Sequence, residues 1–196
     1  HLVLRRQRQM CIRDRIDSGL LIFSPSLNDN GSSYNTFTFT VNDGTTNSTS
    51  SYTMTIDVSA VNDAPVADNE TNTATEGTNL NARNGGSDDV LIGDTDVEND
   101  NLTVTEIRIG STEGSGTSGS VGSFLNGTYG KLKIRSNGSY KYVPNDVLGA
   151  TETGVDWFNY TVSDGNGGTD TATLKITVTG INDCLLYTSD AADEER

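Results

Sequence analysis

The sequence predicts an all-β protein, and three observations support this. Apolar residues alternate with polar ones through Phe158–Ser163 and again through Ala172–Thr179, which is the period of a half-buried strand. The composition is rich in Thr, Ser, Gly, Asn and Asp, while Val, Ile, Phe and Tyr supply the apolar part, as in β proteins with many turns. No stretch keeps a helical period. We therefore expect strands and turns throughout.

A long repeat indicates tandem domains. Val162–Gly165 (VSDG) matches Val41–Gly44 (VNDG), and Ile181–Asp183 (IND) matches Val61–Asp63 (VND), each about 120 residues apart. This spacing is long for a solenoid unit and fits separate domains better. The expected division is into the C-terminal part of one domain, residues 16–63, and a second domain, residues 64–183.

The two ends of the chain read as translated adapter DNA. Arg5–Arg15 is RRQRQMCIRDR and Cys184–Glu194 is CLLYTSDAADE. One DNA sequence read on opposite strands encodes both, and it resembles a transposase-based sequencing adapter. We expect residues 1–15 and 184–196 to be adapter artefacts, outside the fold. Both cysteines and the single histidine lie in these ends, so the rest offers no disulfide, no Cys or His metal ligand and no His-based triad.

The remaining residues 16–183 are acidic, with 22 Asp and Glu against seven Lys and Arg. Such a charge disfavours nucleic acid and anionic membranes as partners, and is compatible with divalent cations or with solubility alone. No apolar run reaches the length of a membrane span. The main basic group is Lys131, Lys133, Arg135 and Lys141. It is interpreted either as one solvated face of a hairpin or as a contact for an anion or a sulfated glycan.

The first piece of the fold is short. Its predicted strands are Leu20–Phe23, Phe37–Val41 and Met54–Val58, and Pro25 ends the first because proline lacks a ladder donor. So few residues hide too little surface to form a sizeable core. We expect this piece to be weakly stable unless it pairs with its neighbour.

The second piece begins at a stiff joint, Asn62-Asp63-Ala64-Pro65. Its first strand is expected in Val66–Asn72.

Near Glu106 the alternation of LTVTEIRI changes face, which indicates a β-bulge. The Gly/Ser tract Gly110–Ser123 is predicted to be a flexible surface loop. Three further expectations are a hairpin over Tyr129–Val143 turning at Asn137-Gly138, a tight turn at Asp164–Asp170, and Trp157 at an edge or the loop side.

Three segments carry a resemblance to a known family. GTYGKLKIRSNGSYKYVP, WFNYTVSDGNGGTDTATLKITVTGIND and DTDVENDNLTV together resemble the VCBS repeat, a cadherin-like module of large bacterial surface proteins and adhesins. The resemblance covers about 64–183, and residues 16–63 resemble the end of a related cadherin-like tandem domain. It implies a seven-stranded Greek-key β-sandwich of cadherin or immunoglobulin-like type, calcium at the joints, and repetition in long secreted chains.

The same resemblance implies calcium ligands. Calcium takes about six to eight oxygen ligands, which aspartates on loops supply, and Asp94 and Asp96 on one loop can point at one ion. In cadherins an Asp-x-Asp pair in this loop, an Asp in the turn before the last strand and an Asn-Asp in the preceding linker converge on one joint. The positions that match are Asn62, Asp63, Asp94, Asp96 and Asp164. Glu76 resembles the glutamate that faces the following joint, where Asp183 would sit.

Departures from the cadherin pattern leave a second interpretation open. The domain has no Asp-Arg-Glu motif, and its linker lacks a further asparagine, which implies fewer ions, lower affinity or none. Without calcium, Asp94, Asp96 and Asp100 are an acidic turn whose carboxylates accept backbone N–H groups, and Asp164 is a turn former. The remaining acidic residues considered, Asp68, Glu98 and Asp170, are expected to be surface charges.

The function expected is that of a non-catalytic, calcium-binding module of a large bacterial secreted or cell-surface adhesin, in adhesion or as a rigid stalk. The alternative is an accessory spacer or carbohydrate-binding domain of a secreted hydrolase. Expected partners are neighbouring tandem domains, and a surface glycan or another cell-surface protein, with no nucleic acid and no membrane insertion. Exposed aromatics on one sheet face would favour glycan binding, and a Thr-rich exterior would favour a spacer.

Overall fold

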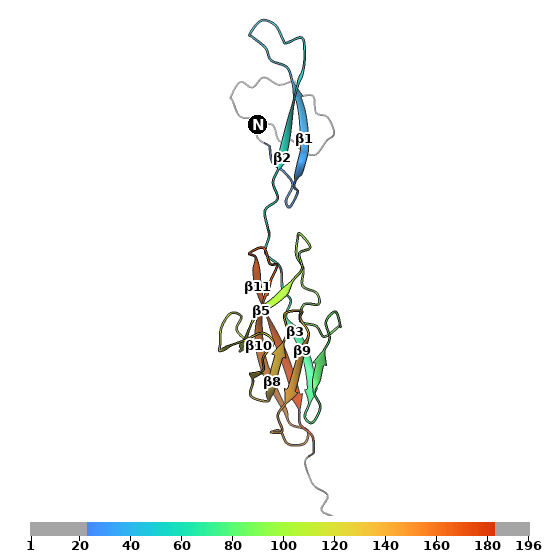
Figure 1. The fold of residues 1–196 in the computed structure, drawn as a ribbon, viewed down its shortest axis with the longest axis vertical. Helices are drawn as coiled ribbons and strands as arrows, with labels where there is room; N and C mark the ends of the chain where they lie inside the picture. Colours follow the sequence, from blue (N-terminus) through green and yellow to red (C-terminus); the bar gives the residue numbers. More distant parts are fainter. Residues whose placement is uncertain (1–22, 183–196) are drawn as a thin grey trace, which may run out of the picture. The chain divides into compact units, whose positions relative to one another are not determined.

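The computed structural model describes residues 23–182, which form strands and loops without a helix (Figure 1). Within this range there is accordingly no helix long and apolar enough to span a membrane. The adapter predictions for residues 1–15 and 184–196, and most of the strand predicted at Leu20–Phe23, lie outside the described residues. The chain divides into two compact units, with the boundary between Val61 and Asn62.

The first unit is a two-stranded antiparallel sheet of β1 (Gly31–Phe39) and β2 (Tyr52–Val58). The aromatic rings of Phe37, Phe39 and Tyr52 follow one another at centroid distances of 6.2 and 5.9 Å. Phe37 is buried, whereas Tyr52 and Met54 are about half exposed. The unit therefore has an apolar stripe but little core.

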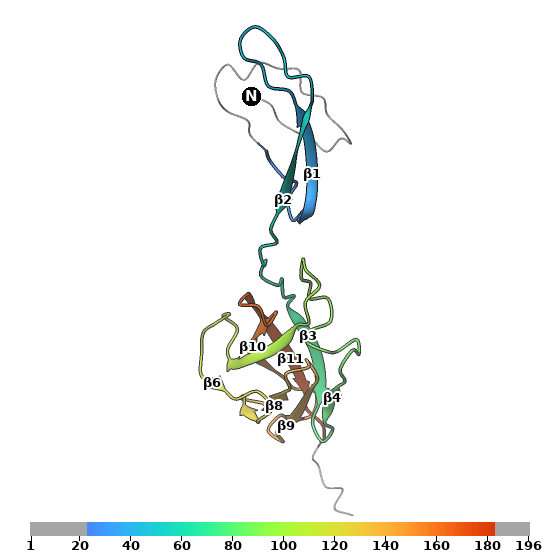
Figure 2. The same ribbon diagram turned by 45° about the horizontal axis from the view of Figure 1, so that its top comes forward.

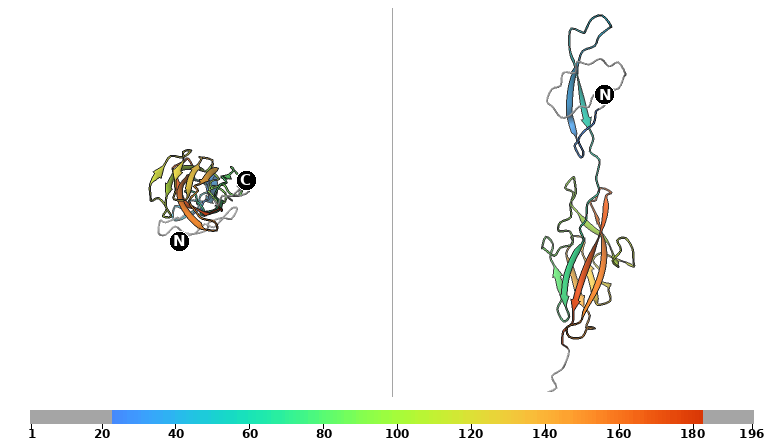
Figure 3. Two further views of the ribbon diagram at one scale, coloured as in Figure 1. Left: turned by 90° about the horizontal axis from the view of Figure 1, so that it is seen from below. Right: turned by 180° about the vertical axis from the view of Figure 1, so that it is seen from behind.

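The second unit contains two sheets. Its strands are β3 (Glu70–Thr75), β4 (Leu80–Ala82), β5 (Thr103–Ile109), β6 (Ser118–Gly119), β7 (Leu125–Asn126), β8 (Gly130–Ile134), β9 (Tyr140–Pro144), β10 (Thr153–Ser163) and β11 (Thr169–Thr179). One sheet has the order β3-β11-β10-β5-β6, with β3 parallel to β11, and Figure 3 shows β3, β11 and β10 side by side. The other has the order β4-β9-β8-β7 (Figure 2). Since β6 and β7 have only two residues each, seven longer strands make the sandwich.

The core lies between these sheets. Leu132, Ile134 and Tyr142 of the four-stranded sheet and Phe158 and Leu174 of the five-stranded sheet belong to one buried cluster. The rings of Tyr142 and Phe158 meet edge to face across the two layers at 6.4 Å. The alternation in β10 and β11 has therefore pointed every second side chain inward, and the predicted all-β sandwich is confirmed.

Local predictions in this unit are largely confirmed. The register of β10 against β5 shifts between Thr161 and Val162, so that Val104 and Ile107 are both buried, and this is the bulge expected near Glu106. The Asn137-Gly138 turn joins β8 to β9. Gly138 has φ +81°, and a Cβ there would lie 1.8 Å from an Asp89 carboxylate oxygen, so both conformation and space require glycine.

One local expectation was wrong. The Gly/Ser tract is not a plain loop, because it contains β6 and is held by the buried Asn159 side chain. Asn159 Nδ2 donates to the Gly110 and Ser115 carbonyls, and its Oδ1 accepts from the Gly114 amide. Trp157, expected at an edge or the loop side, lies on the outer sheet face where β5 has ended: its carbonyl accepts from the amide of Gly110, the first residue of the Gly/Ser tract, and Lys175 Nζ lies 5.5 Å from the centroid of its ring.

Candidate metal centre

The acidic loop Asp94–Asp100 begins beside the extended segment that leaves the joint. The amides of Val66 and Thr95 each donate to the other's carbonyl, at 2.8 and 3.0 Å, which fixes the start of the loop against the first extended segment of the unit. Asn99 then adopts a positive φ of 60°, a conformation that asparagine tolerates and that turns the chain back. The loop therefore presents its carboxylates at the end of the unit where the linker enters.

Asp96 is the central residue of this loop. Its Oδ1 accepts hydrogen bonds from the backbone amides of Glu98 and Asp100, both at 3.0 Å. Its Oδ2 is buried and has no hydrogen-bond partner among the described residues. One oxygen thus forms the turn that the metal-free interpretation expects, and the other remains available. A buried carboxylate oxygen without a donor is costly unless something positive binds it.

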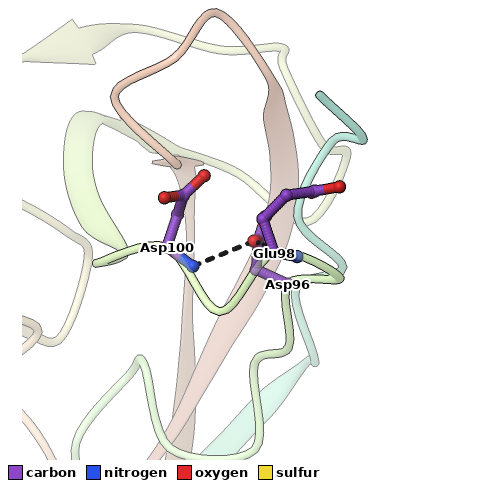
Figure 4. A group of neighbouring side chains, drawn as sticks. All are labelled: Asp96, Glu98 and Asp100. Carbon is purple, nitrogen blue, oxygen red and sulfur yellow. Dashed lines mark hydrogen bonds between the residues drawn. The ribbon is translucent and has the colours of Figure 1, made fainter. Parts of the chain in front are cut away.

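Three carboxylates meet at this loop (Figure 4). One oxygen each from Asp96, Glu98 and Asp100 lies within 4.8 Å of the other two. Two oxygens that bind one calcium ion at about 2.3–2.6 Å can be at most about 5 Å apart. The three side chains therefore satisfy the spacing of a shared calcium ion without rearrangement of the backbone.

The linker and the β10–β11 turn adjoin the same loop. Asn62 Nδ2 donates to Asp164 Oδ2 at 2.6 Å, and Asn166 Nδ2 donates to Asp100 Oδ2 at 2.7 Å. The Asp63 amide donates to Glu98 Oε2 at 3.3 Å. Segments that are about 100 residues apart in sequence thus form one network of oxygen-bearing side chains.

Asp164 is well supplied with hydrogen-bond donors. Besides Asn62, the amides of Asn166 and Gly168 donate to its carboxylate, at 2.7 and 3.0 Å. The Asn62 side chain, followed by these backbone amides, holds the pKa of the Asp164 carboxyl below its usual range. Asp164 is therefore ionised at neutral pH and shapes the turn whether or not a cation is present.

Asp94 lies apart from the Asp96 group. Its Oδ1 accepts from the Asp68 amide at 2.8 Å, and its Oδ2 is buried without a hydrogen-bond partner among the described residues. Burial raises the pKa of Asp94 to about 6, and the negative charges of Asp68 and Asp170 contribute. Asp94 thus belongs to a second acidic group along the first extended segment of the unit.

The raised pKa of Asp94 has a consequence for stability. A carboxyl that binds its proton more tightly when folded stabilises the protein below its ordinary pKa of 3.8, and this contribution is lost as the pH rises through about 6. Asp94→Asn, which mimics the neutral acid, is therefore expected to raise the unfolding midpoint at pH 7 in chelator and to have little effect at pH 3. Thermal unfolding against pH measures this. Exposed Asp88→Asn is the control, and a pH-independent difference for Asp94→Asn would contradict the assignment.

Glu76 lies at the opposite end of the second unit. It follows β3, which runs away from the linker, and its amide donates to Thr179 at the end of the parallel strand β11. The side chain is almost fully buried. Its Oε1 accepts from the amides of Val147 and Leu148, at 2.8 and 2.9 Å, and the Val147 contact is the main cause of a pKa below the usual range. Its Oε2 forms no hydrogen bond of normal geometry with a described residue, although the Ile181 amide also contributes to the lowered pKa of the carboxyl.

The structure thus brings together four of the six predicted ligands, Asn62, Asp63, Asp96 and Asp164, and separates Asp94 and Glu76 from them. It adds three residues that sequence reasoning did not select: Glu98, Asp100 and Asn166. Asp94, Asp96, Glu98 and Asp100 recur at every second position, which was the available signal. Asp170, expected to be a surface charge, accepts from the Ala67 amide at 2.9 Å.

Comparison with known proteins gives structural likenesses of low score. A nucleoside hydrolase-related hypothetical protein from Saccharophagus degradans is 15% identical, with a TM-score of 0.37, and covers 62% of this chain and 26% of its own. The endo-fucoidan hydrolase MfFcnA4 is 16% identical, with a TM-score of 0.36, over 79% of this chain and 20% of its own. A protein from Bacteroides thetaiotaomicron is 16% identical, with a TM-score of 0.28, over 64% of this chain and 95% of its own. Scores this low carry no information on function.

The chain spans about a quarter or less of the first two of these structures. No curated protein matches the sequence. A family model does match: that of the bacterial cadherin-like domain, over residues 62–180, which includes both sheets of the second unit and the acidic loop. The chain therefore belongs to the bacterial cadherin-like domain family.

Proposed function

We propose that the second unit is a non-catalytic, calcium-binding tandem β-sandwich module of a large bacterial secreted or cell-surface adhesin, in which it acts in adhesion or as a rigid stalk. The observation that carries this proposal is the group of Asp96, Glu98 and Asp100, with its unpartnered, buried Asp96 Oδ2. The family implies calcium, and the neighbours expected on each side are further domains of the same kind.

The donor set fits calcium better than other metals. It consists of carboxylate oxygens, with the Asn62, Asp63 and Asp164 region adjoining it, and contains no sulfur or imidazole. Hard divalent cations prefer such ligands. Three carboxylates within 4.8 Å repel one another, and none of them forms an ion pair with another described residue. A bound cation would offset this repulsion and supply the partner that Asp96 Oδ2 lacks.

Calcium at this position would stiffen the entry to the domain. The linker residues Asn62 and Asp63 already hydrogen-bond to the β10–β11 turn and to the acidic loop. One ion bound by the carboxylates of the acidic loop would hold this loop more rigidly. Because the linker hydrogen-bonds to the loop, the ion would also restrict the backbone freedom of the Asn-Asp-Ala-Pro joint. Glu76 Oε2, at the other end of the unit, is the corresponding candidate for the following joint.

Thermal unfolding of the full chain in calcium and in chelator tests this proposal. A ligand that binds only the folded state stabilises it by about 2.7 kcal/mol at a hundredfold excess over Kd. We expect a higher midpoint in calcium for the wild type and a loss of most of this increase in Asp96→Asn. The control is Glu113→Gln, which removes an exposed charge in the loop after β5. An unchanged wild-type midpoint at millimolar calcium would leave the acidic turn as the correct interpretation.

The location and the finer family assignment belong to the same proposal. An extracellular or cell-surface position is typical of bacterial cadherin-like domains, and the VCBS resemblance remains a prediction within that family. The outer face of the five-stranded sheet carries Thr71, Thr73 and Thr177 and one aromatic residue, Trp157. A Thr-rich face of this kind supports a stalk or spacer on that side of the module.

A further inference from the structure

The outer face of the four-stranded sheet has the opposite charge from the rest of the module. It carries four of the seven Lys and Arg residues found between positions 23 and 182, where 20 Asp and Glu occur. These four residues, here called the basic face, are Lys131 and Lys133 of β8, Arg135 just after it, and Lys141 of β9. They point away from the core, because the residues that alternate with them, Leu132, Ile134 and Tyr142, are buried.

The register of the two strands concentrates this charge. Lys133 lies directly opposite Lys141, and Lys131 is the next outward residue along β8. Like charges directly opposite one another destabilise a sheet. Between residues 23 and 182 the only ion pair joins Arg108 to Glu106, so no described carboxylate neutralises the basic face. An otherwise acidic domain thus retains an unfavourable cluster of cations.

An exposed aromatic ring belongs to the same face. Phe124, one residue before β7, has 46% of its surface exposed. Lys131 Nζ lies 5.2 Å and Lys133 Nζ 5.9 Å from the centroid of its ring, which are cation–π distances. The ring gives the basic face an apolar centre. This combination suits a ligand that offers both negative charges and C–H surface.

We propose that the basic face binds a linear anionic polysaccharide, one that carries sulfate or uronate groups. Lysine ammonium groups are flexible point charges that meet such groups without the bidentate geometry that arginine favours. Phe124 offers its exposed apolar surface to the sugar C–H groups.

Binding of dextran sulfate to the full chain, with neutral dextran as the reference, tests the proposal. We expect dextran sulfate to bind at low ionic strength, more weakly as salt is raised, and neutral dextran not to bind. Lys133→Glu is expected to lower the affinity about tenfold, since it reverses one charge within the face. Phe124→Ala is expected to lower it severalfold without a change of charge. Thermal unfolding of each variant verifies that it is folded.

Lys175→Glu is the matched control. Lys175 also lies over an aromatic ring, that of Trp157, but on the outer face of the other sheet. The Lys175→Glu variant changes the net charge of the chain by the same amount as Lys133→Glu, but its substitution lies outside the basic face. Its affinity for dextran sulfate is therefore expected to stay within about twofold of wild type. An equal loss in Lys133→Glu and Lys175→Glu would mean attraction by net charge alone and would overturn the proposal.

Two further results would overturn it. If sedimentation shows self-association that Lys133→Glu abolishes, the occupant of the face is a second copy of this chain. If chelator abolishes dextran sulfate binding, the anion is held through calcium at the acidic loop and not by the lysines. Binding that persists in chelator supports the basic face even if the calcium proposal fails, because the two proposals use different residues.

Discussion

Phe158→Ala is expected to lower the free energy of unfolding of the second unit by about 3–5 kcal/mol, the usual cost of truncating a buried phenylalanine. Phe158 is fully buried in the middle of β10 and meets Tyr142 of the opposite sheet edge to face. Its removal leaves a cavity between the layers that both sheets line. Because β10 pairs with both β11 and β5, neither layer can easily move inward to fill it.

Denaturant unfolding followed by fluorescence measures this loss. The only tryptophan of the chain, Trp157, is the neighbour of Phe158 and reports on the second unit alone. The control is Val155→Ala, on the same strand but on its outer face, where 38% of the side chain is exposed. It should cost less than about 1 kcal/mol. Equal losses in the two variants would show that the packing across the layers is not as described.

The strand pattern of the second unit could be predicted because burial on one face leaves a direct trace in the sequence. In Phe158–Ser163 of β10 and Ala172–Thr179 of β11 apolar residues alternate with polar ones, and the structure buries every one of those apolar residues. The Asn-Gly turn and the bulge in β5 could be read because each has a local cause. Side-chain contacts between distant segments leave no such trace. Asn159 looks like an ordinary outward polar residue of a strand, yet it is buried and holds the Gly/Ser tract.

The candidate site shows the same limit. Asp96 and Asp164 could be selected from the cadherin resemblance, and the structure places both at the linker end of the unit. That Asp94 instead accepts from the Asp68 amide depends on how the Val66–Thr95 bridge orients the chain. That bridge is a contact between segments about 30 residues apart, and no periodicity or motif specifies it.

A carboxylate that sequence reasoning passed over, Asp156, is expected to have the second large effect on stability. It is buried on the inward side of β10 and accepts from the Tyr142 hydroxyl at 2.7 Å and from the Thr128 and Tyr129 amides at 2.8 and 3.1 Å. Burial, and then Asp156 itself, raise the pKa of Tyr142, which therefore stays a hydrogen-bond donor. A Cβ at Gly127 would lie 2.3 Å from Asp156 Oδ2, so the backbone approaches the carboxylate closely.

Asp156→Ala should therefore leave three donors without their acceptor, the buried Tyr142 hydroxyl and the part-buried Thr128 and Tyr129 amides, and cost about 3–5 kcal/mol. Asp156→Asn keeps one acceptor oxygen but turns an amide group toward a backbone donor, and we expect an intermediate loss. Tyr142→Phe removes one donor and should cost about 1 kcal/mol. If the carboxylate acts through these contacts, Tyr142→Phe will cost less in the Asp156→Ala background than in the wild type, because its donor has already lost its acceptor. Strict additivity of the two changes, measured by denaturant unfolding, would instead mean that Asp156 stabilises the unit independently of Tyr142.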